Sequence, residues 1–231
     1  MDAVLFAAGR GARMGALTRS TNKAALRYKK KPLICWVLDD LLRLPLGTIW
    51  ITTGYCAESI HTAVDSCFKS EKRIRFSDDT RARGTAPRLI ELSTTPSIAS
   101  GCLTSPADVI LPKNVLVRLF GCIDETQGEV PVMCLSSRRY IAKTHKLMHE
   151  SRGHVDVCRS WKQQCDGDGW YSEITTRYIP GRCLTQMREE GWPEGTSVSD
   201  YVLQCIERKE RVDAITFDDE WLHFANGNDF R

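Results

Sequence analysis

Residues 3–33 read AVLFAAGRGARMGALTRSTNKAALRYKKKPL, an apolar run followed by closely spaced glycines and basic residues. Its apolar run, residues 3–8, has the length of a buried parallel strand and stops at Gly9 and Gly11. Because glycine permits positive φ and close approach of the backbone, the amides of this turn can face an anion. A helix is expected from Pro32, where apolar residues begin to recur. The stretch therefore predicts a strand, an anion-binding turn and a helix.

Positive charge is concentrated where the glycines are. Residues 1–31 hold eight lysines and arginines and one acid, so they carry +7, and the other 200 residues sum to about −4 within the total of +3. Arg13 presents a guanidinium fork that matches two phosphate oxygens, and Lys23 presents a mobile point charge. The glycines and these cations together predict a loop that holds phosphates.

Three other interpretations of this loop are weaker. A dinucleotide-binding fold also clusters glycines after its first strand, but it needs a second strand that ends in an acid, and none follows. A P-loop needs Gly-Lys-Ser/Thr after the glycines, where this chain has Gly15-Ala16-Leu17. A basic surface turn without a ligand is disfavoured, because the charges fall at the carboxyl end of a strand, where open α/β sheets bind ligands.

The ordered motif resembles the amino-terminal motif of the sugar-phosphate nucleotidyltransferases. In those enzymes it reads roughly L-A-A-G-x-G-x-R, a few residues, P-K, and later G-K-P-L/M-I. The matching residues here are Leu5-Phe6-Ala7-Ala8-Gly9, Gly11, Arg13-Met14, Thr18, Lys23 and Lys31-Pro32-Leu33-Ile34. Asn22 and Lys30 depart from the pattern, because they stand where proline and glycine are usual. Neither departure removes a phosphate ligand.

The resemblance implies an α/β fold: a single-domain three-layer α/β/α sandwich with a mixed, mainly parallel central sheet, the Rossmann-like nucleotidyltransferase fold. Alternation of apolar segments in the first half agrees with a mainly parallel sheet. The expected strands are 3–8, 48–53, 73–76, 101–105, 130–135, 155–157, 170–174, 212–217 and 221–224, and the expected helices are 32–43, 57–68, 86–92, 183–190 and 198–210. We expect one domain, 1–231, with a nucleotide-binding half, 1–125, and an acceptor-binding half, 126–231.

A second motif, Arg83-Gly84-Thr85-Ala86-Pro87, follows the polar stretch 77–80. Taken alone, it is an ordinary pattern for the start of a helix. In the family, a Gly-Thr-Ala turn at this distance opens a helix and helps to form the pocket for base and ribose. The resemblance therefore implies that Gly84 and Thr85 bind nucleotide, together with Ala7, Ala8, Gly9 and Gly11.

Asp108 follows the short apolar strand that starts at residue 101. Family members place here an aspartate that coordinates the Mg²⁺ carried by the nucleotide, and Mg²⁺ prefers such hard oxygen ligands. The family's closing motif, W-x-D-x-x-T-x-x-D-L, is matched at 221–230, with His223 in place of the first aspartate and Asp229 as the second. Imidazole is a poor magnesium ligand. His223 therefore only packs, or Asn226 or a water completes the shell, or one protein carboxylate suffices.

The acceptor pocket of the family is assembled from the second half of the chain, often with a lysine ahead of a G-x-Y strand. Lys162 stands ahead of Gly169-Trp170-Tyr171 and fits this position. A surface lysine and a core tryptophan explain the same residues at least as well.

The resemblance implies nucleotidyl transfer, in which the phosphate of an acceptor attacks the α-phosphorus of a nucleoside triphosphate and pyrophosphate leaves. Arg13 and Lys23 would be catalytic, because they neutralise phosphate charge, and Asp108 would hold Mg²⁺. The expected acceptor is a sugar 1-phosphate, which gives an NDP-sugar. The alternatives are a cytidylyltransferase for a phospho-alcohol or phosphonate, a molybdopterin nucleotidyltransferase, and a nucleotide-binding module in which His223 has removed turnover.

Composition fits a compact enzyme and limits its partners. A chain of 231 residues with 42% hydrophobic content can bury a sizeable core. Its ten cysteines are scattered without a C-x-x-C pair, which favours reduced, packing cysteines. No signal pattern and no run of about 18–20 apolar residues occurs, so we expect a cytoplasmic protein without a membrane partner. The net charge of +3 disfavours nucleic-acid binding, and a homodimer is expected only from the family.

Overall fold

The computed structural model describes residues 1–78, 84–138, 145–152, 155–163 and 170–230. The chain forms two compact units, and each is discontinuous in sequence. The first comprises Met1–Ala82, Ser105–Leu111 and Trp221–Arg231, and the second comprises Arg83–Thr104 and Pro112–Glu220. The nucleotide-binding and acceptor-binding halves expected from the sequence are functional divisions, and they stay predictions.

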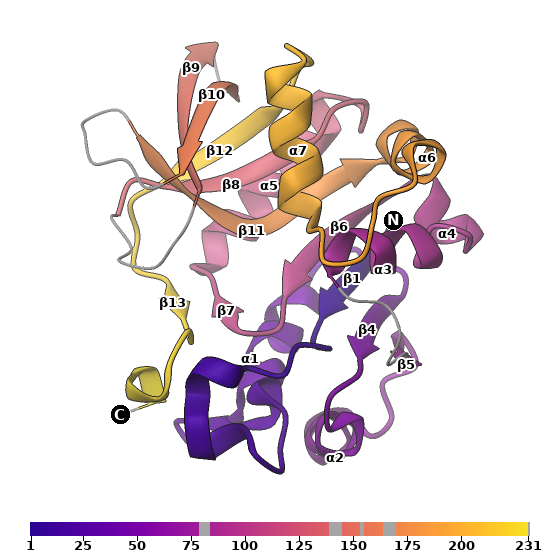
Figure 1. Ribbon diagram of the computed structural model, residues 1–231, viewed down its shortest axis with the longest axis vertical. Helices are drawn as coiled ribbons and strands as arrows, with labels where there is room; N and C mark the ends of the chain where they lie inside the picture. The colour runs from indigo at the N-terminus through magenta and orange to yellow at the C-terminus, as the bar shows by residue number, and fades with distance from the viewer. Residues whose placement is uncertain (79–83, 139–144, 153–154, 164–169, 231) are drawn as a thin grey trace. The chain divides into compact units, whose positions relative to one another are not determined.

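The first unit is built on three parallel strands (Figure 1). β1 (Asp2–Phe6) pairs with β4 (Ile49–Thr53), and β4 pairs with β5 (Ile74–Asp78). In this register Phe6 lies opposite Thr52, and Thr52 lies opposite Ser77. The segments that follow the three strands therefore leave from one edge of the sheet, the edge where α/β proteins bind ligands.

Two helices of this unit follow from the apolar periodicity of their sequences. α1 (Leu33–Leu41) and α2 (Ala57–Phe68) pack against each other. α2 buries only Ile60, Ala63 and Val64, which are spaced for one helical face. Both helices are close to their predicted ranges, and the bounds of α2 are those predicted.

Short elements complete the first unit. β2 (Arg27–Tyr28) and β3 (Lys31–Pro32) form a small antiparallel pair, as do β7 (Val109–Ile110) and β13 (Leu222–His223). Three 3₁₀ helices are present among the described residues of this unit: η1 (Ala12–Thr18), η2 (Lys23–Ala25) and η3 (Gly227–Phe230).

The second unit is built on a mostly antiparallel sheet. Its strands, in spatial order, are β6 (Gly101–Pro106, the first four residues in this unit), β11 (Tyr171–Pro180), β8 (Val132–Ser136), β12 (Asp213–Phe217), β10 (Val155–Gln163) and β9 (His145–Arg152). β8 and β12 pair in parallel, whereas β11 is antiparallel to β6 and β8, and β10 is antiparallel to β12 and β9. Parallel and antiparallel pairs both occur, as predicted: the strand pairs β1–β4 and β4–β5 of the first unit are parallel, and in the second unit β8–β12 is parallel.

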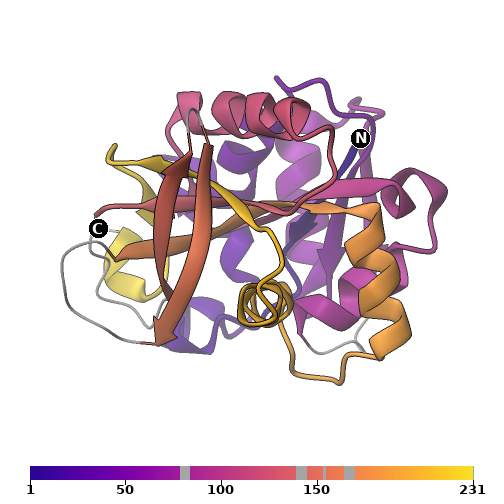
Figure 2. The same cartoon turned by 90° about the horizontal axis from the view of Figure 1, so that it is seen from above.

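The helices of the second unit are α3 (Thr85–Leu92), α4 (Pro96–Ala99), α5 (Lys113–Glu125), α6 (Gly181–Glu190) and α7 (Val198–Glu207). Figure 2 shows α5 and α7 on opposite faces of the sheet. α5 packs on β8 and β12, and α7 packs on β10. The two faces of this sheet are therefore both covered by helices, which explains why β8 is buried along its whole length.

Three elements of the second unit were not predicted: the short helix α4, the helix α5 and the strand β9. α5 contains Val115, Val117 and Gly121, which have low helix propensity, and it is stabilised by burial of its apolar face. β9 is rich in polar residues, and Leu147 is buried on it while Met148 is exposed. Both α5 and β9 depend on tertiary packing rather than on a local pattern.

Most of the described cysteines are buried. Nine of the ten cysteines lie in the described residues; none of these nine forms a disulfide, and seven of them are buried. Within the described part of the chain, every helix is too short or too polar to traverse a bilayer.

Candidate active site

The predicted catalytic lysine and the predicted metal-binding aspartate meet in the first unit. The ammonium of Lys23, at the start of η2, forms an ion pair with Oδ2 of Asp108, which precedes β7. The side chains are 17% and 14% exposed. The Ala107 N–H donates a 3.0 Å hydrogen bond to the carbonyl of Phe6, so Asp108 is held next to the end of β1. Two motifs 85 residues apart are thereby brought together.

His223 lies near the same carboxylate oxygen. Its Nε2 is 3.6 Å from Oδ2 of Asp108, and its ring stacks on Trp221 at 6.3 Å between centroids. Pairing of β13 with β7 places His223 opposite Val109, and the Phe224 N–H donates to the Asp108 carbonyl at 3.1 Å. The histidine that stands at the first aspartate position of the closing motif is therefore directed at Asp108.

The carboxyl group of Asp108 stays ionised. Burial raises its pKa, but hydrogen bonding from His223 and the positive charge of Lys23 outweigh burial and lower the pKa to about 2. At neutral pH the Asp108 carboxylate can therefore only accept hydrogen bonds, and the Lys23 ammonium and the His223 imidazole both face its Oδ2.

An apolar cluster supports this group of charges. Met14, Leu33 and Phe224 are buried together, and Tyr28 and Ile110 pack against them. The rings of Tyr28 and Phe224 meet edge to face, with centroids 4.9 Å apart. Residues from four segments of the first unit therefore fix the chain on both sides of Asp108 and His223.

The glycine loop takes the backbone conformation that its sequence predicts. Gly11 has φ 63° and ψ 39°, and a Cβ added there would lie 3.0 Å from Cβ of Lys23. Glycine is needed at position 11 because it tolerates this positive φ and because a Cβ would crowd Lys23. The Thr18 hydroxyl donates to the Gly11 carbonyl at 3.1 Å, which closes the loop. Arg10 and Arg13 are exposed on this loop, so their guanidinium groups are open to an anion.

Two residues that shape the loop were missed as functional residues. The Tyr55 hydroxyl lies 2.9 Å from the Thr18 carbonyl and 2.7 Å from the Arg19 carbonyl. Asn22, which appears in sequence only as a departure from the family pattern, is buried beside Lys23. The departure itself was the signal that could have marked Asn22, whereas Tyr55 had none.

The predicted base-binding turn lies in the second unit. Gly84 precedes α3 with φ 92°, and a Cβ there would lie 2.2 Å from the Thr196 carbonyl oxygen. The Val198 N–H donates to the Thr85 hydroxyl at 2.9 Å. These contacts within the unit explain why a glycine and a threonine occur here, and their role in nucleotide binding stays a prediction.

For the other predicted site residues, the structure gives a strand position or local hydrogen bonds. Lys162 lies on β10, opposite Lys146 on β9. Gly169 lies outside the described residues. Asp229 accepts the Asn226 N–H at 2.7 Å, and Asn226 Oδ1 accepts the Asn228 N–H at 3.1 Å, so both side chains stabilise the turn at η3.

The donor set at Asp108 fits a cation that brings most of its own ligands. In the described residues, no three side chains among His, Cys, Asp and Glu gather into a potential metal site. One ionised carboxylate can complete the shell of a Mg²⁺ that also binds nucleotide phosphates and water. The residues therefore fit a nucleotide-borne magnesium ion and do not form a closed protein cage.

The chain matches one known domain family over most of its length. The model of the MobA-like NTP transferase domain matches residues 3–188, a span that includes the glycine loop, Lys23 and Asp108. No curated protein sequence matches the chain.

Solved structures share the fold over nearly the whole chain. A Bacillus anthracis protein assigned as a glucose-1-phosphate thymidylyltransferase, in complex with sucrose, has a TM-score of 0.82 at 15% identity, covering 99% of this chain and 92% of its own. A UDP-glucose pyrophosphorylase with UDP-glucose has a TM-score of 0.82 at 15% identity, covering 100% and 95%. The inositol-1-phosphate CTP transferase from T. maritima has a TM-score of 0.75 at 13% identity, covering 100% and 91%. These likenesses confirm the predicted α/β fold.

Proposed function

Since the chain belongs to the MobA-like NTP transferase domain family, we propose that it transfers a nucleotidyl group from a nucleoside triphosphate to a sugar 1-phosphate, with release of pyrophosphate. The observation that carries this proposal is the Lys23–Asp108 ion pair beside the glycine loop. It joins a phosphate-neutralising cation and an ionised carboxylate at the ligand-binding edge of a parallel sheet.

The proposed reaction needs no protein nucleophile. An oxygen of the acceptor phosphate attacks the α-phosphorus, and the bond from that phosphorus to the oxygen bridging to the β-phosphate breaks. The electron pair leaves with pyrophosphate. Acceptor phosphates are already anionic near pH 7, so the protein contributes mainly position and charge neutralisation.

Four residues of the first unit have separate roles in the proposed reaction. Arg13 is exposed on the glycine loop, and its fork suits the departing pyrophosphate oxygens. Lys23 neutralises charge between the α-phosphate and the acceptor phosphate. Asp108 would hold Mg²⁺, which supplies further charge neutralisation on the phosphates when bound. His223 keeps the Asp108 carboxylate ionised and oriented.

The acceptor class rests on the names of the similar proteins. Those proteins are named for glucose 1-phosphate, UDP-glucose and inositol 1-phosphate. The acceptors among these names, glucose 1-phosphate and inositol 1-phosphate, are phosphate monoesters of polyols, which supports a sugar 1-phosphate here. The inositol-1-phosphate CTP transferase favours a second candidate, a cytidylyltransferase for a phosphorylated alcohol.

The test is pyrophosphate release with Mg²⁺, each of the four common nucleoside triphosphates, and a pool of sugar 1-phosphates and phospho-alcohols. Asp108→Asn keeps the size of the side chain and removes its charge, and we expect it to lower kcat/KM by at least 100-fold. Asp218→Asn, at an exposed aspartate of the second unit, is the matched control and should leave turnover unchanged.

The outcomes separate the candidate functions. Release that requires one triphosphate and one acceptor, and that is lost in Asp108→Asn, supports the transferase and identifies both substrates. Triphosphate binding by calorimetry without release from any pair would contradict the transferase and favour a binding module.

A further inference from the structure

Asn22 makes an unusual number of hydrogen bonds for one side chain. It is 1% exposed. Its Nδ2 lies 2.9 Å from the Ala7 carbonyl, 3.3 Å from the Gly9 carbonyl and 2.8 Å from the Tyr55 carbonyl. Its Oδ1 accepts the Ala24 N–H at 2.9 Å. One amide therefore joins the segment after β1, the segment after β4 and the first turn of η2.

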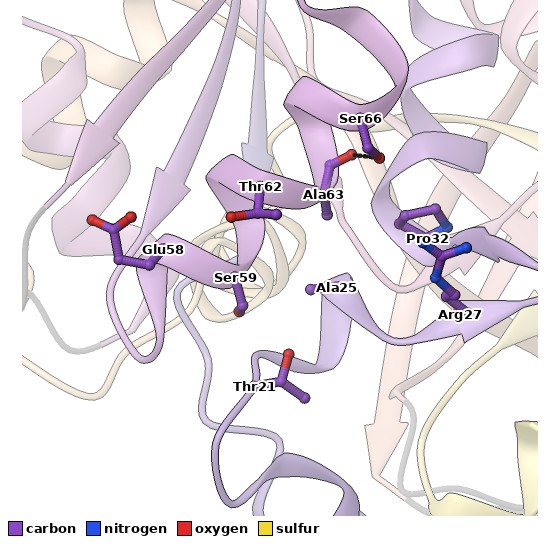
Figure 3. Close-up of a pocket in the computed structure, with 9 residues that line it drawn as sticks. All are labelled: Thr21, Ala25, Arg27, Pro32, Glu58, Ser59, Thr62, Ala63 and Ser66. Atoms are coloured by element: carbon purple, nitrogen blue, oxygen red, sulfur yellow. Dashed lines mark hydrogen bonds between the residues drawn. The ribbon is translucent and has the colours of Figure 1, made fainter.

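The backbone N–H of Asn22 makes a further hydrogen bond, to α2. This N–H donates to Oγ of Ser59 at 2.9 Å, and that hydroxyl donates to the Cys56 carbonyl at 2.6 Å. Ser59 lies on α2 and faces a groove of about 350 Å³, which Thr21 and Ala25 also line (Figure 3). The chain around Asn22 is thus tied to the start of α2 as well as to the sheet edge.

Lys23 follows Asn22 directly, so these bonds fix where its side chain begins. Asn22 is the N-cap of η2, with φ −73° and ψ 145°. The Cβ of Lys23 lies 3.0 Å from the position of a Cβ on Gly11, so the loop and the lysine pack with no spare room. A small shift at Asn22 would move the ammonium group away from its present position against Asp108.

We propose that Asn22 is a positioning residue for Lys23: its side-chain amide fixes the loop 9–23 and thereby places the lysine ammonium at the reacting phosphates. This role rests on the proposed nucleotidyl transfer. A misplacement of about 1 Å at a positioned group can lower turnover about 100-fold. Asn22 itself touches no reacting atom.

Two variants of Asn22 and one of Ser59 test the role. Asn22→Ala removes all side-chain bonds, and Asn22→Asp keeps the acceptor for Ala24 but turns an oxygen toward three carbonyls. Ser59→Ala removes only the acceptor of the backbone N–H and is the mildest of the three. Ser66→Ala is the matched control, because its hydroxyl donates to the Ala63 carbonyl within α2 and lines the same groove.

The first readout needs no substrate. Arg13 and Arg19 are exposed on the loop, so brief trypsin digestion reports loop opening, while cleavage after exposed Lys209 in the second unit reports general unfolding. We expect Asn22→Ala and Asn22→Asp to speed cleavage in the loop at least tenfold relative to cleavage after Lys209. Ser66→Ala should keep the wild-type ratio.

The second readout is kinetic. We expect kcat to fall 10- to 100-fold in both Asn22 variants, with a smaller change in KM for the triphosphate, and a fall of a few fold in Ser59→Ala. Wild-type cleavage ratios and wild-type kcat in Asn22→Ala would overturn the proposal. If that variant does not fold, wild-type cleavage ratios and wild-type kcat in Asn22→Asp would do so. If the wild-type protein shows no turnover, the proposed function fails, and the cleavage ratio still decides whether Asn22 fixes the loop.

Discussion

Substitution of Gly84 by alanine should destabilise the second unit more than an ordinary glycine substitution. The residue has φ 92° and ψ 162°, a region that only glycine enters readily, and this conformation alone costs about 1–3 kcal/mol for alanine. The new Cβ would also lie 2.2 Å from the Thr196 carbonyl oxygen, which is backbone and cannot rotate away. We expect a total loss of about 3 kcal/mol in the free energy of unfolding.

Gly191 is the matched control for this prediction. It also has a positive φ, 65°, but nothing lies within 4 Å of a Cβ added there. Gly191→Ala should therefore lose only the conformational part, about 1 kcal/mol. Urea unfolding followed by circular dichroism measures both losses, and thermal scans should show a decrease of about 6–12 °C in Tm for Gly84→Ala. Equal losses in the two variants would refute the steric argument.

Three further predictions concern buried and charged groups. The side chains of Glu173 and Arg177 are each 2% exposed and form an ion pair at 2.5 Å. Glu173→Leu leaves the buried guanidinium without its carboxylate and should lower the free energy of unfolding by about 3–5 kcal/mol. The double variant with Arg177→Met should recover most of this loss, as measured by urea unfolding. The pKa of Asp108 is about 2 in the folded protein, below its unfolded value. Its ionised form should therefore add about 2 kcal/mol to the free energy of unfolding above pH 5, and this contribution should disappear as the pH falls toward 2. Urea unfolding across this pH range measures it. Burial raises the pKa of Cys134 and Cys205 to about 12, so a thiol reagent at pH 8 should react quickly with exposed Cys67 and slowly with these two.

Each of these predictions has a variant or condition that can contradict it. No recovery in the Glu173→Leu/Arg177→Met double variant would show that the cost is not that of an unpaired charge. If Asp108→Asn left the loss of stability at low pH unchanged, that loss would be due to other carboxylates. A fast thiol phase that persists in the triple variant Cys56→Ser/Cys67→Ser/Cys165→Ser would show that the buried thiols are accessible.

Local sequence patterns were sufficient to predict the elements whose conformation depends on residues close to them in the sequence. The run that becomes β1, the turn at Gly11 and the bounds of α2 were predicted from apolar spacing and from the conformational freedom of glycine. The resemblance implied only that Lys23 and Asp108 serve one reaction, and their ion pair was not predicted, because no local rule joins residues 85 positions apart.

The rest of the fold and site depends on contacts that a single sequence does not display. α5 forms despite its valines because one face is buried, and β9 owes its strand conformation to pairing with β10 and β11. The bonds of Asn22 join carbonyls from two different strand ends, so its importance follows from the assembled sheet edge. The position of His223 against Asp108 likewise depends on the pairing of β13 with β7.

That pairing of β13 with β7 has a consequence for synthesis of the chain. The two strands belong to one unit, but residues Pro112–Glu220 of the other unit lie between them in sequence. A nascent chain leaves the ribosome from its amino end, so the Lys23–Asp108 pair can form long before His223 has been made. The glycine loop and its carboxylate therefore spend much of translation without the imidazole, and the site is completed only after the second unit has emerged.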